Sequence, residues 1–294
     1  MYLLHGDAFI DTFLGFHNVT RFLSPEHPEG VLWYYFIPVL ILGFLPWTAI
    51  LIQALWAALT DSRPQQGRQL LFFIIWAAFI FLFFTASRTK LVSYILPMYP
   101  PLAMLVGWYI DRIADWRRRT RPVAWPLLLT VFGGLFAGGA VYGAANRMPA
   151  LLPGAALTAA VFAAMIIGVW YCVWRREIDR AFWLQTAGMA LFAVIFATML
   201  VPPAAPAFHS RDIAQAFTAH YDGRSPVYVA KFLRPGFAFY SGVYGEQLKS
   251  AHWTAPGKAY FVARPSDYEW LKAADKQRLT ILATLQEKLL IVKK

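Results

Sequence analysis

The sequence predicts a mainly α-helical protein: a polytopic membrane helix bundle of about six transmembrane helices, followed by a small α/β domain. Hydrophobic residues make up 59% of the 294 residues and charged residues only 15%. Soluble domains usually carry about a quarter charged residues. Six apolar segments are each long enough to cross a hydrocarbon core about 30 Å thick. After the last of them the apolar runs shorten and the charge density rises, which is typical of a water-exposed domain.

We expect three regions along the chain. Residues 1–32 form an outer loop with an interfacial helix, residues 33–202 the transmembrane region, and residues 203–294 the α/β domain. The first region lacks a basic start, and charged and histidine side chains interrupt its apolar residues, so it is neither a signal peptide nor a spanning helix. Its phenylalanines fall near helical spacing, which favours a helix lying in the membrane interface.

The transmembrane region divides into six apolar runs. The expected spans are residues 33–57, 70–86, 91–110, 124–145, 151–174 and 182–201. Prolines interrupt the first and third spans, where they kink a helix and release backbone carbonyls. The fourth and fifth spans are rich in glycine and alanine, which lets neighbouring helices approach closely.

The tail alternates between short helix and strand patterns. We expect helices in RDIAQAFTAHY, around FAFYSG and in SDYEWLKAAD. We expect strands in PVYVAKF, KAYFVAR and TILATLQEKLLIVKK. This succession predicts a small α/β domain.

The charges of the short loops predict the orientation in the membrane. Ten cations lie in three loops on one side, residues 58–69, 111–123 and 175–181. The loops of the other side hold only Arg88, Lys90 and Arg147. By the positive-inside rule, the first set is cytoplasmic. The N-terminal region, the turn SRTK and the α/β domain then face outside, which in a bacterium is the periplasmic side of the inner membrane.

Several function classes are disfavoured by the composition. The net charge of +11 does not indicate a nucleic-acid partner, because basic residues of membrane proteins gather in cytoplasmic loops. The spans are nearly free of ionisable side chains, with Gln53 and Gln185 as the main interior polar groups, whereas a transporter needs ionisable residues near the midplane. Cys172 is the single cysteine and is expected to pack in an apolar run. The histidine spacing matches no standard metal site, so no metal is assigned.

The turn SRTK places two cations at the outer membrane boundary, against the charge bias. Long cationic side chains near helix ends commonly reach lipid headgroups, and this explanation of Arg88 and Lys90 stays open. The alternative is a site for an anionic headgroup, with lysine as a point charge and arginine as a fork for phosphate. The next span opens with Tyr94 and a proline, which favour an irregular backbone beside the cations.

The segment FHNVTRF supplies a second outer group: His17, Asn18 and Arg21. His17 and Arg21 are four residues apart, so on a helix they share one face. A solvated amphipathic helix explains the same pattern, and both interpretations stay open.

Taken in order, FHNVTRF, WYYFIPVLILGFLPW and SRTKLVSYILPMYPPLAML resemble the second half of bacterial lipid-linked-sugar glycosyltransferases. This family contains the aminoarabinose transferase that modifies lipid A and relatives similar to protein O-mannosyltransferases. The resemblance covers nearly the whole chain and is most specific between residues 5 and 105. It implies a multi-pass inner-membrane enzyme that takes a sugar from undecaprenyl phosphate and moves it to a periplasmic acceptor: lipid A, another glycan or a protein. The polyprenyl-phosphate sugar is then the donor substrate, and no cofactor is assigned.

The resemblance also implies roles for the outer polar residues. Fixed cations at the leaving lipid phosphate would stabilise its developing charge. Phosphate binding is implied for Arg21 and Lys90, and less specifically for Arg88. His17, Asn18 and Tyr94 would contact the substrate or support the residues that do.

The family's catalytic acidic residue lies in an outer loop upstream of every segment matched here. Asp7 and Asp11 are carboxylates on the expected side but do not sit in the family's acidic motif, so no catalytic residue is assigned. We therefore expect a fragment without the catalytic loop, from a truncated, split or decayed gene, completed by a missing N-terminal half or a partner subunit. The alternative is a non-catalytic membrane module that binds polyprenyl-phosphate lipid or supports a partner subunit.

Overall fold

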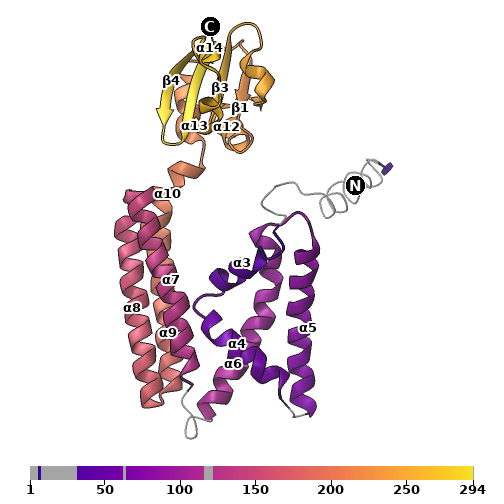
Figure 1. Cartoon of the computed structure of the whole chain (residues 1–294), viewed down its shortest axis with the longest axis vertical. Helices are drawn as coiled ribbons and strands as arrows, with labels where there is room; N and C mark the ends of the chain where they lie inside the picture. The colour runs from indigo at the N-terminus through magenta and orange to yellow at the C-terminus, as the bar shows by residue number, and fades with distance from the viewer. Residues whose placement is uncertain (1–5, 8–31, 62–63, 116–121, 294) are drawn as a thin grey trace. The chain divides into compact units, whose positions relative to one another are not determined.

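The computed structural model describes residues 6–7, 32–61, 64–115 and 122–293. The chain divides into two compact units, Met1–Ile195 and Phe196–Lys294. The described part of the first unit is helical, and the second carries a five-stranded sheet (Figure 1). The predicted fold class, a membrane helix bundle followed by a small α/β domain, is confirmed.

The first unit is built from long helices joined by short irregular segments. Its described helices are α3 (Phe36–Gly43), α4 (Thr48–Leu59), α5 (Pro64–Ala86), η3 (Val92–Met98), α6 (Tyr99–Asp115), α7 (Ala124–Arg147), η4 (Pro149–Leu151), α8 (Leu152–Arg175) and α9 (Ile178–Ile195). α8 contacts both α7 and α9, and α4 contacts α5, α6 and α7. One continuous cluster of buried side chains joins these helices.

The number of membrane spans differs from the expected six. In the described residues, four helical stretches are long and apolar enough to cross a membrane: Gly67–Ala86, Ala124–Arg147, Pro149–Arg175 and Ile178–Phe208. A fifth exists if α3 and α4, which are bent by 107°, are counted as one broken span. Among the described residues there are therefore four or five candidate spans.

Prolines explain why the first and the third expected spans are not continuous α-helices. Pro46 lies in the break between α3 and α4, where its missing N–H and fixed φ oppose a continuous helix. Pro97 lies inside η3, so the expected third span begins as a 3₁₀ helix and continues as α6 of 17 residues. The end of α6 carries Asp111, Arg112 and Asp115, which shortens its apolar part further.

Small residues and one buried polar pair hold α7, α8 and α9 together. A Cβ at Gly133 would lie 3.1 Å from the Phe162 ring, and one at Gly188 would lie 3.0 Å from Met165 Sδ, so glycine permits these close approaches. Trp125 Nε1 donates a hydrogen bond of 2.9 Å to Gln185 Oε1 between α7 and α9, and both side chains are fully buried. Gln185, expected as an interior polar group, thus joins two helices.

The second unit begins with helical segments and continues as an α/β domain. Its elements are η5 (Phe196–Leu200), α10 (Val201–Phe208), α11 (Arg211–Thr218), β1 (Val227–Val229), α12 (Arg234–Ser241), β2 (Glu246–Gln247), η6 (Ser250–Trp253), β3 (Ala259–Ala263), α13 (Pro265–Glu269), α14 (Ala273–Lys276), β4 (Leu279–Leu285) and β5 (Lys288–Lys293). The strand order is β2-β1-β3-β5-β4. The pairs β2–β1 and β1–β3 are parallel, whereas β3–β5 and β5–β4 are antiparallel.

The last predicted strand is in fact a hairpin. TILATLQEKLLIVKK divides into β4 and β5, with Gln286 at a positive φ of 53° in the turn. Sequence reasoning misses this turn because glycine and asparagine, the usual residues of tight hairpin turns, are absent from it. The two-residue strand β2 was also not predicted, because it is too short to show a periodicity.

The sheet is buried on both faces. Along β3, Tyr260 and Val262 belong to one apolar cluster and Phe261 to the other, as the period of two in a strand requires. Lys288, at the start of β5, is buried and donates hydrogen bonds to the carbonyls of Pro206 and His209. This lysine ties the end of α10 to the sheet.

Candidate functional site

The turn SRTK connects the end of α5 to η3 in the first unit. Ser87, Thr89 and Lys90 are buried, with 3%, 3% and 6% of their surface exposed, whereas Arg88 is exposed. The two cations that the sequence singled out therefore have different surroundings. Lys90 faces the interior of the unit, and Arg88 faces outward.

Hydrogen bonds within the turn fix the lysine. Lys90 Nζ donates a bond of 2.6 Å to the Ser87 carbonyl, and Ser87 Oγ donates one of 2.9 Å to the Thr89 carbonyl. Burial lowers the pKa of the Lys90 ammonium from its ordinary value, because desolvation disfavours the charged form. The turn is thus a compact polar cluster that holds a cation beside backbone carbonyls at the end of an apolar helix.

Tyr94 follows the turn in η3 and has a packing contact. Its ring centroid lies 5.0 Å from that of Phe84, with 34° between the planes, and its backbone N–H donates to the Leu91 carbonyl. Thr85 lies near the end of α5, shortly before the turn SRTK. Its buried hydroxyl has no hydrogen-bond partner among the described residues. Sequence reasoning did not single out Thr85, because a threonine in an apolar helix normally bonds to its own backbone.

The remaining sequence-predicted residues lie elsewhere. Arg21, His17, Asn18 and Asp11 fall outside the described residues. Asp7 is described and is exposed. In the described ranges, no group of three or more histidine, cysteine or carboxylate side chains could hold a metal ion.

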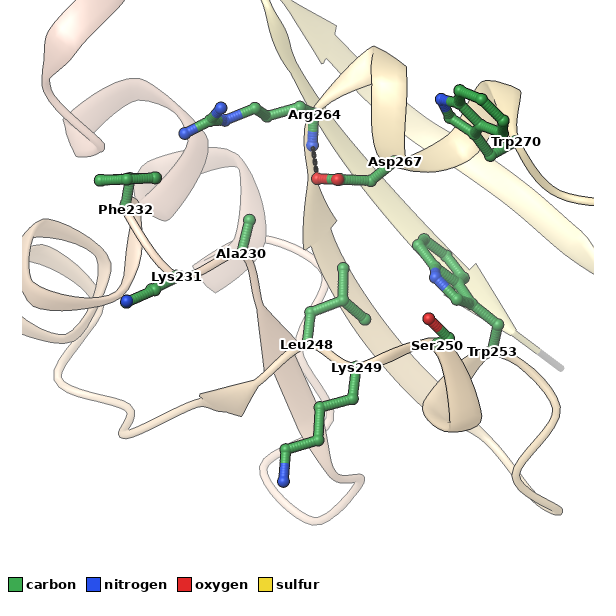
Figure 2. A pocket seen from close by; sticks show the side chains of 10 residues that line it. All are labelled: Ala230, Lys231, Phe232, Leu248, Lys249, Ser250, Trp253, Arg264, Asp267 and Trp270. Carbon is green, nitrogen blue, oxygen red and sulfur yellow. Dashed lines mark hydrogen bonds between the residues drawn. The ribbon is translucent and has the colours of Figure 1, made fainter. Parts of the chain in front are cut away.

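A second candidate site lies in the α/β domain, and sequence reasoning missed it. A hollow of about 420 Å³ opens where β1, β2 and β3 end (Figure 2). Its lining residues are Ala230, Lys231, Phe232, Leu248, Lys249, Ser250, Trp253, Arg264, Asp267 and Trp270. They come from three segments, each following a different strand, so no local pattern reveals the set. The only sequence signal is a cation shortly after each strand.

Two contacts organise this hollow. The guanidinium carbon of Arg264 lies 4.9 Å from the centre of the Phe232 ring. The backbone N–H of Arg264 donates a bond of 3.0 Å to Asp267 Oδ2, drawn as the dashed line in Figure 2. A cation, a carboxylate and an aromatic ring therefore share one side of the hollow.

No family profile matches the chain. Curated relatives do match it in part. The chain is 35% identical over 112 residues to undecaprenyl phosphate-alpha-4-amino-4-deoxy-L-arabinose arabinosyl transferase 1 of Proteus mirabilis (strain HI4320), over 38% of this chain and 20% of that protein. It is 30% identical over 195 residues to the corresponding transferase of Pectobacterium carotovorum subsp. carotovorum (strain PC1), over 65% of this chain and 34% of that protein. These alignments span about a third or less of the length of the relatives.

A solved structure has the same fold. The crystal structure of ArnT from Cupriavidus metallidurans bound to undecaprenyl phosphate superposes with a TM-score of 0.62 at 22% identity, over 98% of this chain and 56% of that chain. The apo structure of the same protein gives a TM-score of 0.57. The chain therefore spans about half of the length of that protein. The resemblance read from the sequence motifs is thereby confirmed: the chain is a multi-pass membrane protein related to the undecaprenyl-phosphate aminoarabinose transferases.

Proposed function

We propose that this chain is part of a membrane glycosyltransferase that binds an undecaprenyl-phosphate-linked sugar and passes the sugar to a periplasmic acceptor such as lipid A. The observation that carries the proposal is the buried Lys90 in the turn between α5 and η3. A buried ammonium attracts an anion more strongly than an exposed one, because the dielectric constant around it is lower. A lipid phosphate at the membrane surface is such an anion.

The chemistry assigns the cations a direct task. As the glycosidic bond breaks, negative charge develops on the leaving phosphate and the sugar gains oxocarbenium character. An ammonium already held by the Ser87 carbonyl needs little reorganisation to stabilise that charge. The exposed Arg88 would add a guanidinium fork, and Arg21 a third cation from the N-terminal region. His17, Asn18 and Tyr94 are proposed to contact the substrate around them.

The proposal includes an orientation. Residues 1–32, which precede the transmembrane region 33–202, and residues 203–294, which follow it, would both face the periplasm. The support is the excess of cations in the loops 58–69, 111–123 and 175–181, which would face the cytoplasm. In the last of these loops, Arg180 pairs with Glu177 at 3.0 Å. The names of the relatives support the aminoarabinose donor, and the undecaprenyl phosphate bound to the structure of the same fold supports a polyprenyl-phosphate ligand.

The test measures sugar transfer by the natural protein in its own membranes. Undecaprenyl-phosphate aminoarabinose would be supplied, and modified lipid A quantified by mass spectrometry. Lys90→Met is expected to lower the transfer rate by roughly 10²-fold, as for other preorganised donors. Arg21→Ala is expected to act in the same direction, and Arg180→Ala, on the opposite side, to leave the rate unchanged.

A second variant separates chemistry from folding. Lys90 is buried, so Lys90→Met could disturb the fold, whereas Arg88 is exposed and Arg88→Ala should not. Thermal unfolding and undecaprenyl phosphate binding by native mass spectrometry would be recorded for each variant. Wild-type transfer in both Lys90→Met and Arg21→Ala would refute the proposal. Lipid binding without transfer by the natural protein would favour the lipid-binding module instead.

A further inference from the structure

We propose that the hollow at the ends of β1, β2 and β3 binds a saccharide that carries a phosphate group. This site lies within the α/β domain, and the proposal does not depend on the function proposed above. Four independent features of the domain support it: its position in the sheet, its size, its charge and its aromatic lining.

The position is that of a ligand site in open α/β sheets. β1 lies between β2 and β3, and all three strands are parallel. After β1 the chain turns to one side, through α12 to β2, whereas after β3 it turns to the other side, toward β4. Where neighbouring connections diverge in this way, a crevice opens outside the carboxyl ends of the strands. The lining residues lie in the segments 230–232, 248–250 and 264–270, which follow these strands.

The volume and the charge fit a small anionic ligand. About 420 Å³ lies within the range of small-molecule sites. The lining contains the cations Lys231, Lys249 and Arg264 and one carboxylate, Asp267. Phosphate suits this set because a guanidinium offers two parallel donors and an ammonium offers a point charge.

Arg264 is the best-positioned cation. In Figure 2 its side chain extends toward Phe232, and its guanidinium lies 4.9 Å from that ring. Stacking on an aromatic face holds the planar fork in one orientation, so less freedom is lost when it binds an anion. Lys249 points away from the other side chains in the same view and belongs to the rim.

The aromatic and neutral groups favour a sugar as the remainder of the ligand. Trp270 is 89% exposed and Phe232 is 65% exposed, so both present apolar ring surface to solvent. In Figure 2, Phe232 lies near Arg264, and Trp270 lies beyond Asp267. Such ring surfaces suit the apolar C–H face of a sugar. Asp267 and Ser250 supply oxygen atoms for hydroxyl groups. Trp253 is stacked on Phe261 at 4.6 Å and is 6% exposed, so it presents little ring surface to a nucleobase.

The test is binding to the full chain in nanodiscs, measured by calorimetry. The soluble probes are glucosamine 1-phosphate, glucosamine, inorganic phosphate and adenosine monophosphate. We expect glucosamine 1-phosphate to bind more tightly than the other three. Nanodiscs with and without a phosphorylated glycolipid, titrated with glucosamine 1-phosphate, distinguish a lipid headgroup from a free sugar phosphate, because a glycolipid bound in the hollow competes with the soluble probe.

Charge-removing variants locate the site. Lys231→Ala and Arg264→Gln are each expected to weaken binding of glucosamine 1-phosphate by about tenfold or more. Arg224→Ala is the matched control, because this exposed arginine precedes β1 and lies at the opposite end of that strand. Lys231 is exposed, so its removal should leave the thermal unfolding temperature unchanged.

Three results would overturn the proposal. One is the absence of binding, by the soluble probe and by the glycolipid, at millimolar concentration. Another is an affinity unchanged by both Lys231→Ala and Arg264→Gln. The third is binding of inorganic phosphate or adenosine monophosphate that equals or exceeds that of glucosamine 1-phosphate. Sugar transfer is measured in a separate assay. Its outcome tests the function proposed above and does not change the interpretation of these binding measurements.

Discussion

Buried lysines in this chain take backbone carbonyls as close partners. Lys90 donates to the Ser87 carbonyl, Lys288 to those of Pro206 and His209, and Lys293 to that of Trp253 at 3.1 Å. A buried ammonium loses its hydration, and carbonyl dipoles offset part of that cost. Lys288 and Lys293 in this way each join β5 to another segment of the α/β domain. The residue is thus used as a connection between backbone segments as well as a charge.

Lys288→Met should destabilise the α/β domain. The variant keeps the apolar stem but leaves two partly buried carbonyls without this donor, which costs about 1–3 kcal/mol. Urea unfolding of the full chain, followed by a fluorophore placed in this domain, would measure the change. Lys272→Met, at an exposed position, is the control. Equal unfolding midpoints for the two variants would contradict the assigned role.

The exposed ion pair of Asp222 and Lys258 predicts that the stability of the fold depends on pH in the acidic range. The Lys258 ammonium, 2.7 Å away, and bonds from Ser225 and Arg224 hold the pKa of Asp222 well below its usual range. A carboxyl with a depressed pKa stabilises the fold above its unfolded pKa, near 4, and that stability is lost as the pH falls further. Asp222→Asn should therefore unfold at a slightly lower temperature than the wild type at pH 7. The difference should shrink below pH 4, and a difference that stays constant down to pH 2 would count against this pair.

At the scale of elements, helix packing is decided by which glycines face a neighbour. Gly133 and Gly134 are adjacent in α7, yet a Cβ at Gly133 would lie 3.1 Å from Phe162, whereas one at Gly134 would meet nothing within 4 Å. The two adjacent glycines of α7 therefore have different surroundings. One glycine permits contact with α8, and the other has open space beside it.

This difference gives a matched pair of variants. Gly133→Leu should destabilise the contact between α7 and α8 by about 1–3 kcal/mol, because overpacking forces side chains or backbone to shift. Gly134→Leu should be neutral or stabilising, since leucine is a better helix former. Thermal unfolding in detergent would measure both. A larger loss in Gly134→Leu would show that the helix faces are assigned incorrectly.

Elements were predicted best where length and composition alone decide them. Long apolar runs gave α5, α7, α8 and α9, because a lipid-facing helix needs only apolar side chains. The breaks at Pro46 and Pro97 were expected as kinks, but their size depends on tertiary contacts. The turn SRTK was recognised from its charge, whereas the inward direction of Lys90 follows from a backbone turn that sequence does not specify. The hollow in the α/β domain could not be predicted, because the sheet brings its three segments together.

At the scale of the whole molecule, the proposed orientation gives a direct labelling experiment. In a Cys172→Ala background, single cysteines would be introduced as Arg88→Cys, Arg224→Cys and Arg180→Cys, all at exposed positions. A membrane-impermeant maleimide applied to spheroplasts should label positions 88 and 224, and should label position 180 only after permeabilisation. Labelling of position 180 in intact spheroplasts would reverse the orientation.

The place of β5 in the sheet has a consequence for biosynthesis. β5 follows every other strand in the chain but lies between β3 and β4 in space. As the chain emerges, the ribosome releases β1, β2, β3 and β4 before the strand that joins the two halves, so β3 waits with an unpaired edge. Closure of the sheet, and with it the bonds of Lys288 to the end of α10, therefore comes after residues 288–293 are made. In the proposed orientation the domain lies in the periplasm, so the sheet would close only after translocation, and until then the unpaired edge of β3 would be exposed to chaperones and to proteases.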